Sequence, residues 1–197
     1  MKKGIVSLLF LGFVSSAHAS AHASGSLLID LFLSQARTLD VIDWKVGDTA
    51  NYDMQLGFFG KGTVKKSATK EEEGAIWVET NAKTPLGDEK VETLISRADG
   101  KILKLIVNGQ EQKYEEHEIE LISKDAAEIT VPAGTFKTIH VKVKDKTDSS
   151  DVEAWVNPRD IPLGGIVKSV VVKSFLTVTL ELTSFGRKET IKTVAEL

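Results

Sequence analysis

The chain has 197 residues, a formal net charge of −3 and no cysteine. The missing thiols exclude disulfide bonds, thiolate metal sites, cysteine nucleophiles and a cysteine-linked lipid, so stability must come from core burial and sheet hydrogen bonds. The mildly negative charge gives no long-range attraction to phosphate backbones or anionic lipid surfaces, and we therefore expect no nucleic-acid partner.

The N-terminus has the order of a secretory signal peptide. A pair of lysines precedes an apolar run over residues 5–14, and small residues follow it. Two Ala-x-Ala sites allow cleavage after Ala19, which we favour, or after Ala23. The apolar run, about ten residues, is too short for a membrane-spanning helix, which needs roughly 20. We therefore predict a signal peptide over 1–19, no transmembrane span in the mature chain, and a periplasmic or secreted protein.

Residues 24–45 are predicted to form one amphipathic helix and a linker. Apolar residues recur there at spacings of three and four, which places them on one face of a helix. The residues of this face that we expect to act as a plug are Leu28, Leu31, Phe32 and Leu39. The Val46-Gly47-Asp48 segment then breaks the helical pattern. The helix is expected to pack on a sheet and cover its hollow.

Residues 46–197 have the pattern of one antiparallel β domain. Ile139, Val141 and Val143 alternate with polar residues, and the same alternation recurs over 176–182. Weaker strand patterns cover residues 52–59, 76–80, 91–96, 102–107, 118–122 and 152–156. Between them, Asn108-Gly109 and Asp99-Gly100 are typical of tight hairpins. These features predict a mainly β fold, a curved antiparallel sheet or open half-barrel with meander topology, on which the N-terminal helix packs.

No constellation of catalytic or metal-binding residues stands out. His117 among glutamates, the aspartates at 145, 148 and 151, and the glycine-rich segment 57–63 are each better explained by exposed strands and turns than by a metal site, a calcium loop or a phosphate loop. The Gly-x-Ser-x-Gly motif of serine nucleophiles is absent. We therefore predict that the protein is not an enzyme and has no catalytic residues, no cofactor and no metal.

Two tryptophans, Trp77 and Trp155, lie within strand patterns, each on the face opposite its apolar neighbours. If both face inward, they line a cavity for a lipid or a peptide. Ordinary core packing and an exposed sheet edge are the other two interpretations. The predicted apolar lining consists of Phe58, Trp77, Leu94, Leu103, Ile139, Val141, Trp155 and Leu180.

Three short motifs resemble those of a known group of exported proteins. The first motif, Val46-Gly47-Asp48, precedes an aromatic strand that begins at Tyr52. The second, Val131-Pro132-Ala133-Gly134-Thr135-Phe136, leads into the strand that ends at Val143. The third is a strand with Trp155 that precedes Pro162-Leu163-Gly164-Gly165. In this order, over residues 46–172, they resemble the LolA/LolB-like lipoprotein-carrier half-barrels. The resemblance implies an open, curved antiparallel sheet with a helix across its hollow, where the carriers hold acyl chains. The several-helix lid of the carriers has no counterpart beyond the one predicted helix.

Two functions are consistent with these observations. The first is a periplasmic carrier-like protein that shelters a lipid or another apolar small molecule in its half-barrel. The second is a non-catalytic structural or interaction module whose sheet edge or exposed strand face binds an envelope protein. A carrier needs a continuous apolar hollow of at least several hundred Å3, whereas an interaction module is packed solid. A secreted hydrolase is the least favoured function, because no converging acid/base pair is visible.

Overall fold

The computed structural model describes residues 42–114, 117–147, 149–174 and 176–188. The predicted signal peptide and the predicted helix, with its plug residues Leu28, Leu31, Phe32 and Leu39, lie outside the described residues. The strands are β1 (Thr49–Leu56), β2 (Lys61–Glu72), β3 (Ala75–Thr84), β4 (Gly87–Ser96), β5 (Ile102–Val107), β6 (Gln110–Gln112), β7 (Ile119–Val131), β8 (Gly134–Asp145), β9 (Ser150–Val156), β10 (Ile166–Lys173) and β11 (Leu176–Gly186). A 3-10 turn, η1 (Gly57–Phe59), joins β1 to β2.

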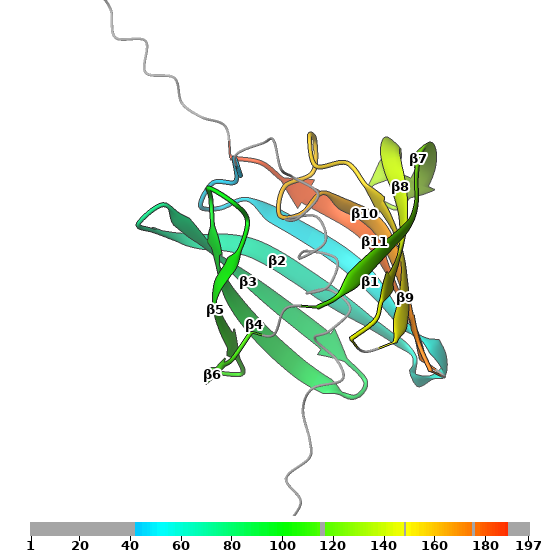
Figure 1. The fold of residues 1–197 in the computed structure, drawn as a ribbon, viewed down its shortest axis with the longest axis horizontal. Helices are drawn as coiled ribbons and strands as arrows, with labels where there is room; N and C mark the ends of the chain where they lie inside the picture. Colours follow the sequence, from blue (N-terminus) through cyan, green and yellow to red (C-terminus); the bar gives the residue numbers. More distant parts are fainter. Residues whose placement is uncertain (1–41, 115–116, 148, 175, 189–197) are drawn as a thin grey trace, which may run out of the picture.

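All eleven strands belong to one antiparallel sheet with the order β6-β5-β4-β3-β2-β1-β11-β10-β9-β8-β7. The chain moves outward from β1 to the edge at β6, passes to the opposite edge at β7, and returns to pair β11 with β1 (Figure 1). The sheet curves strongly and stays open between β6 and β7, so it is not a closed barrel. The predicted curved antiparallel sheet is therefore confirmed.

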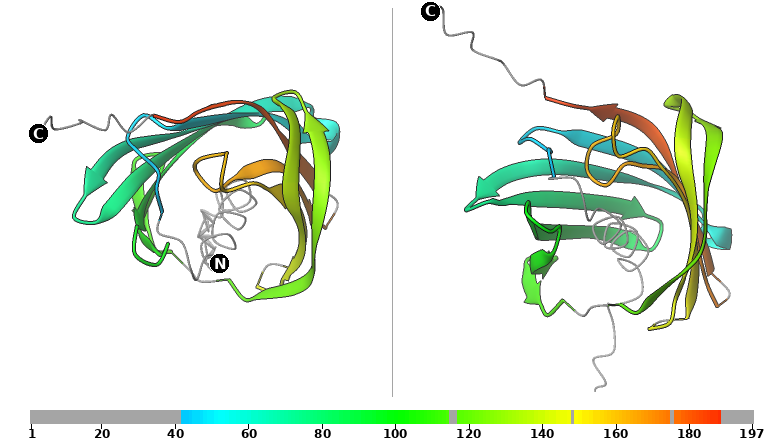
Figure 2. Two further views of the ribbon diagram at one scale, coloured as in Figure 1. Left: turned by 90° about the horizontal axis from the view of Figure 1, so that it is seen from above. Right: turned by 45° about the horizontal axis from the view of Figure 1, so that its top comes forward.

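The two faces of the sheet differ in polarity. On β9, Val152, Ala154 and Val156 are buried while the residues between them are exposed or half-buried, and β4 alternates in the same way over 91–95. The buried set lies on the concave face, because the loop between β9 and β10, which packs on it, lies inside the curve of the sheet (Figure 2). The convex face carries charged cross-strand pairs such as Lys168 and Glu181, whose Nζ and Oε1 are 2.7 Å apart.

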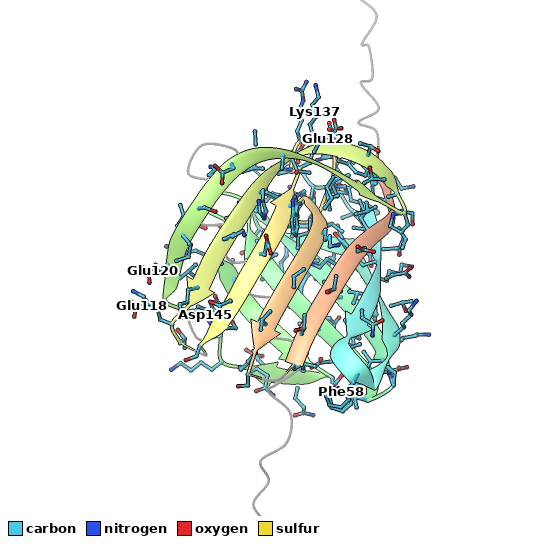
Figure 3. All side chains as sticks on the ribbon, turned by 90° about the vertical axis from the view of Figure 1, so that its right-hand side faces the viewer. Phe58, Glu118, Glu120, Glu128, Lys137 and Asp145 are labelled. Atoms are coloured by element: carbon cyan, nitrogen blue, oxygen red, sulfur yellow. The ribbon has the colours of Figure 1, made fainter. Side chains whose placement is uncertain are left out.

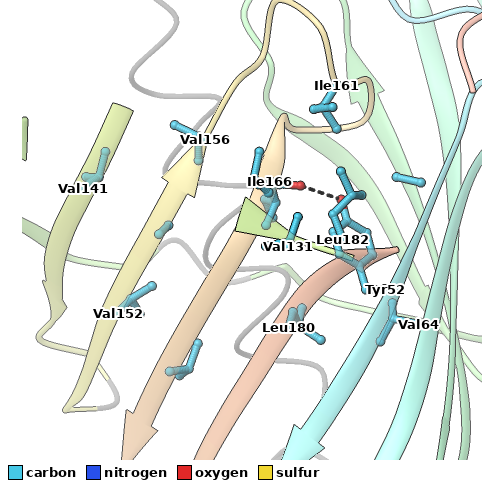
Figure 4. Close-up of a cluster of buried hydrophobic side chains, with 14 of the residues drawn as sticks. Tyr52, Val64, Val131, Val141, Val152, Val156, Ile161, Ile166, Leu180 and Leu182 are labelled. Atoms are coloured by element: carbon cyan, nitrogen blue, oxygen red, sulfur yellow. Dashed lines mark hydrogen bonds between the residues drawn. The ribbon is translucent and has the colours of Figure 1, made fainter. Parts of the chain in front are cut away.

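The β9–β10 loop, residues 157–165, packs on part of this concave face. Ile161 is fully buried beside Tyr52 and Ile166 (Figure 4), and the Tyr52 hydroxyl donates a hydrogen bond to the Ile166 carbonyl at 3.3 Å. Leu163 is buried in a second apolar group. The Pro-Leu-Gly-Gly motif is thus part of a structural plug built by the loop itself.

Gly165 allows the base of this loop to close. Its φ is +74°, and a Cβ at this position would lie 2.5 Å from the backbone N and Cα of Pro158. The backbone N–H of Asn157 donates to the Gly165 carbonyl at 2.7 Å, so the two arms of the loop are in direct backbone contact. Only a residue without a side chain combines this conformation with this approach.

We expect Gly165→Ala to be more destabilising than Gly74→Ala. Gly74, with φ of +80°, has the same left-handed conformation, but nothing lies within 4 Å of a Cβ built there. The backbone penalty is therefore shared, and only Gly165→Ala adds overpacking, which costs about 1–3 kcal/mol. Urea unfolding followed by tryptophan fluorescence measures both variants. Equal losses of unfolding free energy would contradict the packing of the loop described above.

Candidate functional site

Three of the eight residues predicted to line a cavity lie on the concave face. Val141 and Leu180 are buried there, 4% and 3% exposed. Ile139 pairs with the buried Val156 across β8 and β9 and is itself 37% exposed. Ile139 and Val141 come from β8 and Leu180 comes from β11. Val141 and Leu180 belong to one cluster of buried apolar residues.

Trp77, Leu94 and Trp155 lie on the convex face. Trp77 pairs with Leu94 across β3 and β4, and its Nε1 donates to Glu72 Oε2 at 2.9 Å. Trp155 pairs with His140, and the two rings stack with centroids 4.4 Å apart and planes 11° from parallel. Both tryptophans are half-buried among polar neighbours. One cavity wall therefore does not contain all eight predicted residues.

The remaining two predicted residues, Phe58 and Leu103, lie at the margins of the sheet. Phe58 is 76% exposed in η1, at the end of the β1–β2 hairpin (Figure 3). Leu103 is 59% exposed at a register shift where β5 meets β4. Contact between any of the eight residues and a ligand stays a prediction.

An ion-pair network surrounds Trp155 on the convex face. Glu153 Oε1 lies 2.7 Å from His140 Nε2 and 3.1 Å from Lys142 Nζ. Partial burial would raise the pKa of Glu153, but the hydrogen bonds and positive charges of Lys142 and His140 outweigh it and hold the pKa below its ordinary value of 4.5. The network stabilises the packing of the Trp155 ring on the sheet.

Arg97 holds the segment that precedes β1. Its Nη1 and Nη2 donate to the carbonyls of Ile42 and Trp44 at 2.7 and 2.6 Å, and its guanidinium also pairs with Glu71. The side chains of Ile42 and Trp44 are buried in one apolar group with Leu163 of the β9–β10 loop. The arginine therefore fixes a chain segment that closes one end of the hollow.

Arg187 performs the corresponding role from the end of β11. Its Nη1 pairs with Asp43 Oδ2 at 3.0 Å, while its Nε and Nη2 donate to the carbonyls of Asp160 and Pro158, each at 3.1 Å. One planar guanidinium thus connects the segment before β1 to the β9–β10 loop. The two arginines and the loop together make the closed end of the hollow.

The Val46-Gly47-Asp48 motif is a structural clamp at the same end. Asp48 is 1% exposed, and its carboxylate accepts the backbone N–H of Lys45 at 2.9 Å and that of Lys188 at 2.7 Å. Its backbone carbonyl accepts the N–H of Ala68 on β2 at 3.0 Å. Asp48 therefore ties the segment before β1 to the end of β11 through its carboxylate and to β2 through its backbone carbonyl.

Exposed apolar side chains and an acid–histidine pair border the opening of the sheet. Leu121 and Ile122 are 52% and 59% exposed at a register shift of the edge strand β7. Near its start, His117 Nδ1 lies 2.6 Å from Oδ2 of the buried Asp145. Glu118, Glu120 and Asp145 are visible along this edge in Figure 3. A bulge and charges on an edge strand hinder uncontrolled pairing with other strands.

Two features are absent from the part of the chain that the structure describes. No group of three or more histidine, aspartate or glutamate side chains there is arranged to hold a metal ion. In the same residues, no helix has the length and apolar character needed to cross a membrane.

We expect Asp48→Asn to destabilise the fold by about 1–3 kcal/mol, because an amide replaces one of the two acceptors with a donor and leaves a buried backbone N–H unpaired. Asp43→Asn is the matched control, since the Asp43 side chain is 65% exposed and makes one surface ion pair. Its loss should stay below about 1 kcal/mol. Chemical denaturation measures both, and similar losses would show that Asp48 is not the clamp.

We expect Glu153→Gln to alter the acid side of the stability profile. Because the pKa of Glu153 is lower in the folded state than its ordinary value of 4.5, its ion pairs stabilise the fold above that value. This contribution is lost as the pH falls through the lowered folded pKa. The variant should therefore be less stable than wild type near neutral pH and equally stable in acid. Urea unfolding over a pH series measures the difference, and a constant gap would refute the prediction.

Comparisons with known proteins give only distant structural likeness. No family model matches the chain, and no curated protein sequence matches it. The protein CT021 of Chlamydia trachomatis is 10% identical over 83% of this chain and 94% of its own, with a TM-score of 0.49. A protein with a YmcC-like fold from Bacteroides fragilis is 13% identical over 75% of this chain and 99% of its own, with a TM-score of 0.43. MucB, which has also been solved with MucA(peri), is 12% identical over 85% of this chain and 61% of its own, with a TM-score of 0.44.

Proposed function

We propose that the protein is an exported, non-enzymatic binding protein of the periplasm or the medium that shelters a lipid or another apolar molecule on the concave face of its sheet. The observation that carries the proposal is the difference between the two faces of an open sheet. The concave face bears most of the buried apolar residues, with Lys66 buried among them, and the convex face bears exposed ion pairs such as that of Lys168 and Glu181. The motifs that resemble lipoprotein-carrier half-barrels and the predicted signal peptide support the same function.

The apolar concave face suits a chain-like apolar ligand. Val91 and Leu105 on one half of the sheet and Val141 and Val152 on the other belong to the concave face. One end is closed by the β9–β10 loop and the segment held by the arginines, whereas the sheet stays open between β6 and β7. Each methylene of an acyl chain removed from water there contributes about 0.8 kcal/mol.

A second function, the binding of an envelope protein along a sheet edge, is favoured by one observation. The edge strand β7 is 13 residues long and exposes Leu121 and Ile122. An extended partner segment adds to such an edge through backbone hydrogen bonds. The register shift at Leu121 makes this edge irregular, which is why we place this function second.

The deciding experiment is native mass spectrometry, with lipid extraction, of the mature protein purified from its own envelope without detergent. We expect a stoichiometric adduct of lipid mass that disappears on extraction. A clean mass of the protein alone would contradict the binding of a lipid and would favour the protein-partner function.

Two matched variants locate the ligand. Ile139 on the concave face and Val172 on the convex face are branched apolar strand residues with 37% and 39% exposure. A carboxylate at the first position places a charge in the hollow, whereas one at the second position meets solvent. We expect Ile139→Asp to reduce the adduct at least tenfold and Val172→Asp to leave it within twofold of wild type. Equal loading of the two variants would contradict a site on the concave face.

A further inference from the structure

A polar groove with a volume of about 540 Å3 lies on the convex face, over β11, β1, β2 and β3. It is thus on the other side of the sheet from the proposed lipid site. Met54 and Gly62 line it together with the polar residues Asp53, Gln55, Lys61, Thr63, Lys83, Thr179 and Glu181. Strand register places them together: Glu181 pairs with Asp53, Asp53 with Thr63, and Thr63 with Lys83 in one row across four strands. Gln55 and Lys61 pair in the adjacent row.

Two carboxylates face each other in this groove. Asp53 and Glu181 occupy directly opposite positions of β1 and β11, an arrangement of like charges that weakens strand pairing. Lys168 offsets Glu181 through an ion pair of 2.7 Å. Within the described ranges, the exposed carboxylate of Asp53 has no ion pair or side-chain hydrogen bond. A local conflict of this kind, offset only on the side of Glu181, is typical of a functional position.

Two ammonium groups line the other side of the groove. Lys61 on β2 and Lys83 on β3 are exposed, and the described part of the chain gives neither of them an ion pair. Gln55 pairs with Lys61 and is fixed by hydrogen bonds from its side-chain amide to the carbonyls of Gly57 and Gly60, at 2.7 and 3.2 Å. The groove therefore offers negative charge over β11 and β1 and positive charge over β2 and β3.

The separation of these charges sets the size of a ligand. Asp53 and Lys83 lie two strands apart, which corresponds to roughly 10 Å between their backbones. An extended peptide advances about 3.3 Å for each residue, so two or three residues separate a free amino group from a free carboxylate by a similar length. A ligand with only one kind of charge would leave one side of the groove uncompensated.

We propose that this groove binds a zwitterionic ligand, a short peptide of two or three residues with both termini free. Its ammonium group contacts Asp53 and Glu181, and its carboxylate contacts Lys61 and Lys83. The site is independent of the lipid site, because the residues of the two sites point to opposite faces of the sheet.

The test is an NMR titration of the 15N-labelled mature protein with trialanine, compared with N-acetyl-trialanine amide, which lacks both terminal charges. We expect trialanine to shift the amide signals of β1, β2, β3 and β11 to saturation, with a Kd of roughly 1 mM or tighter. The blocked peptide should produce no saturating shift. Added salt should weaken the binding of trialanine, because the contacts are exposed ion pairs.

Three variants test the roles of single charges. Asp53→Asn and Lys83→Gln should each weaken the binding of trialanine at least tenfold. Lys65→Gln is the control, because Lys65 lies on the same face of β2, two residues from Thr63, and does not line the groove. It should bind within twofold of wild type. All three residues lie on the surface, so loss of binding through unfolding is excluded by unchanged amide signals elsewhere in the sheet.

The proposal is overturned by equal binding of the blocked peptide, by the absence of saturating shifts up to about ten times the expected Kd, or by normal binding to Asp53→Asn. It is also overturned if inorganic phosphate or maltose, used as an anionic and an uncharged probe, saturates the same signals more tightly than trialanine. Ile139→Asp, which is expected to lose lipid, should bind trialanine normally. Failure of one site can therefore be distinguished from failure of the other.

Discussion

The antiparallel pairing of β1 with β11 is the interaction on which the rest of the structure depends. It joins the two series of hairpins, β1 to β6 and β7 to β11, into one sheet, through a register that runs from Thr49 opposite Gly186 to Leu56 opposite Val178. This contact connects the two ends of the domain. The entropic cost of closing a loop of more than a hundred residues therefore has to be offset by other interactions. The Asp48 carboxylate and the Arg187 guanidinium lie directly beside it and supply buried and partly buried hydrogen bonds.

Closing the sheet at β1–β11 and leaving it open at β6–β7 gives the molecule two unlike faces. The concave face needs a cover for its apolar side chains, and the β9–β10 loop provides part of it with Ile161 and Leu163. The convex face needs none and is free to carry ion pairs and the polar groove. A protein with this arrangement has room for two independent sites, one driven by burial of apolar surface and one by charge.

The sequence indicates the strongest strands and turns but not the faces. Alternation over 139–143 and 176–182 correctly marks β8 and β11, and Asn108-Gly109 forms the predicted hairpin, with φ of +51° and +80°. Most of β2 is missed, because the buried face of this strand contains Lys66 and Ala68 among its apolar positions. The glycines of Gly60-Lys61-Gly62 also suggest a turn at the point where β2 begins. Alternation separates Trp155 from Val152 but does not say which side is concave. The groove is invisible in the sequence, since its residues meet only through the register of four strands.

The three motifs that carry the resemblance to carrier half-barrels all lie where distant parts of the chain meet. Asp48 ties the beginning of β1 to the end of β11, and Leu163 packs with the segment before β1. The third motif, the Pro132-Ala133-Gly134 turn, contacts β11, because the Ala133 N–H donates to the Leu182 carbonyl at 3.0 Å. Phe136 and Phe185 also make an edge-to-face contact. Such motifs hold distant parts of a curved sheet together, and they do not depend on the residues of its surface. They carry no information about a ligand, so the side chains of the two faces are the positions at which the proposed functions must be tested.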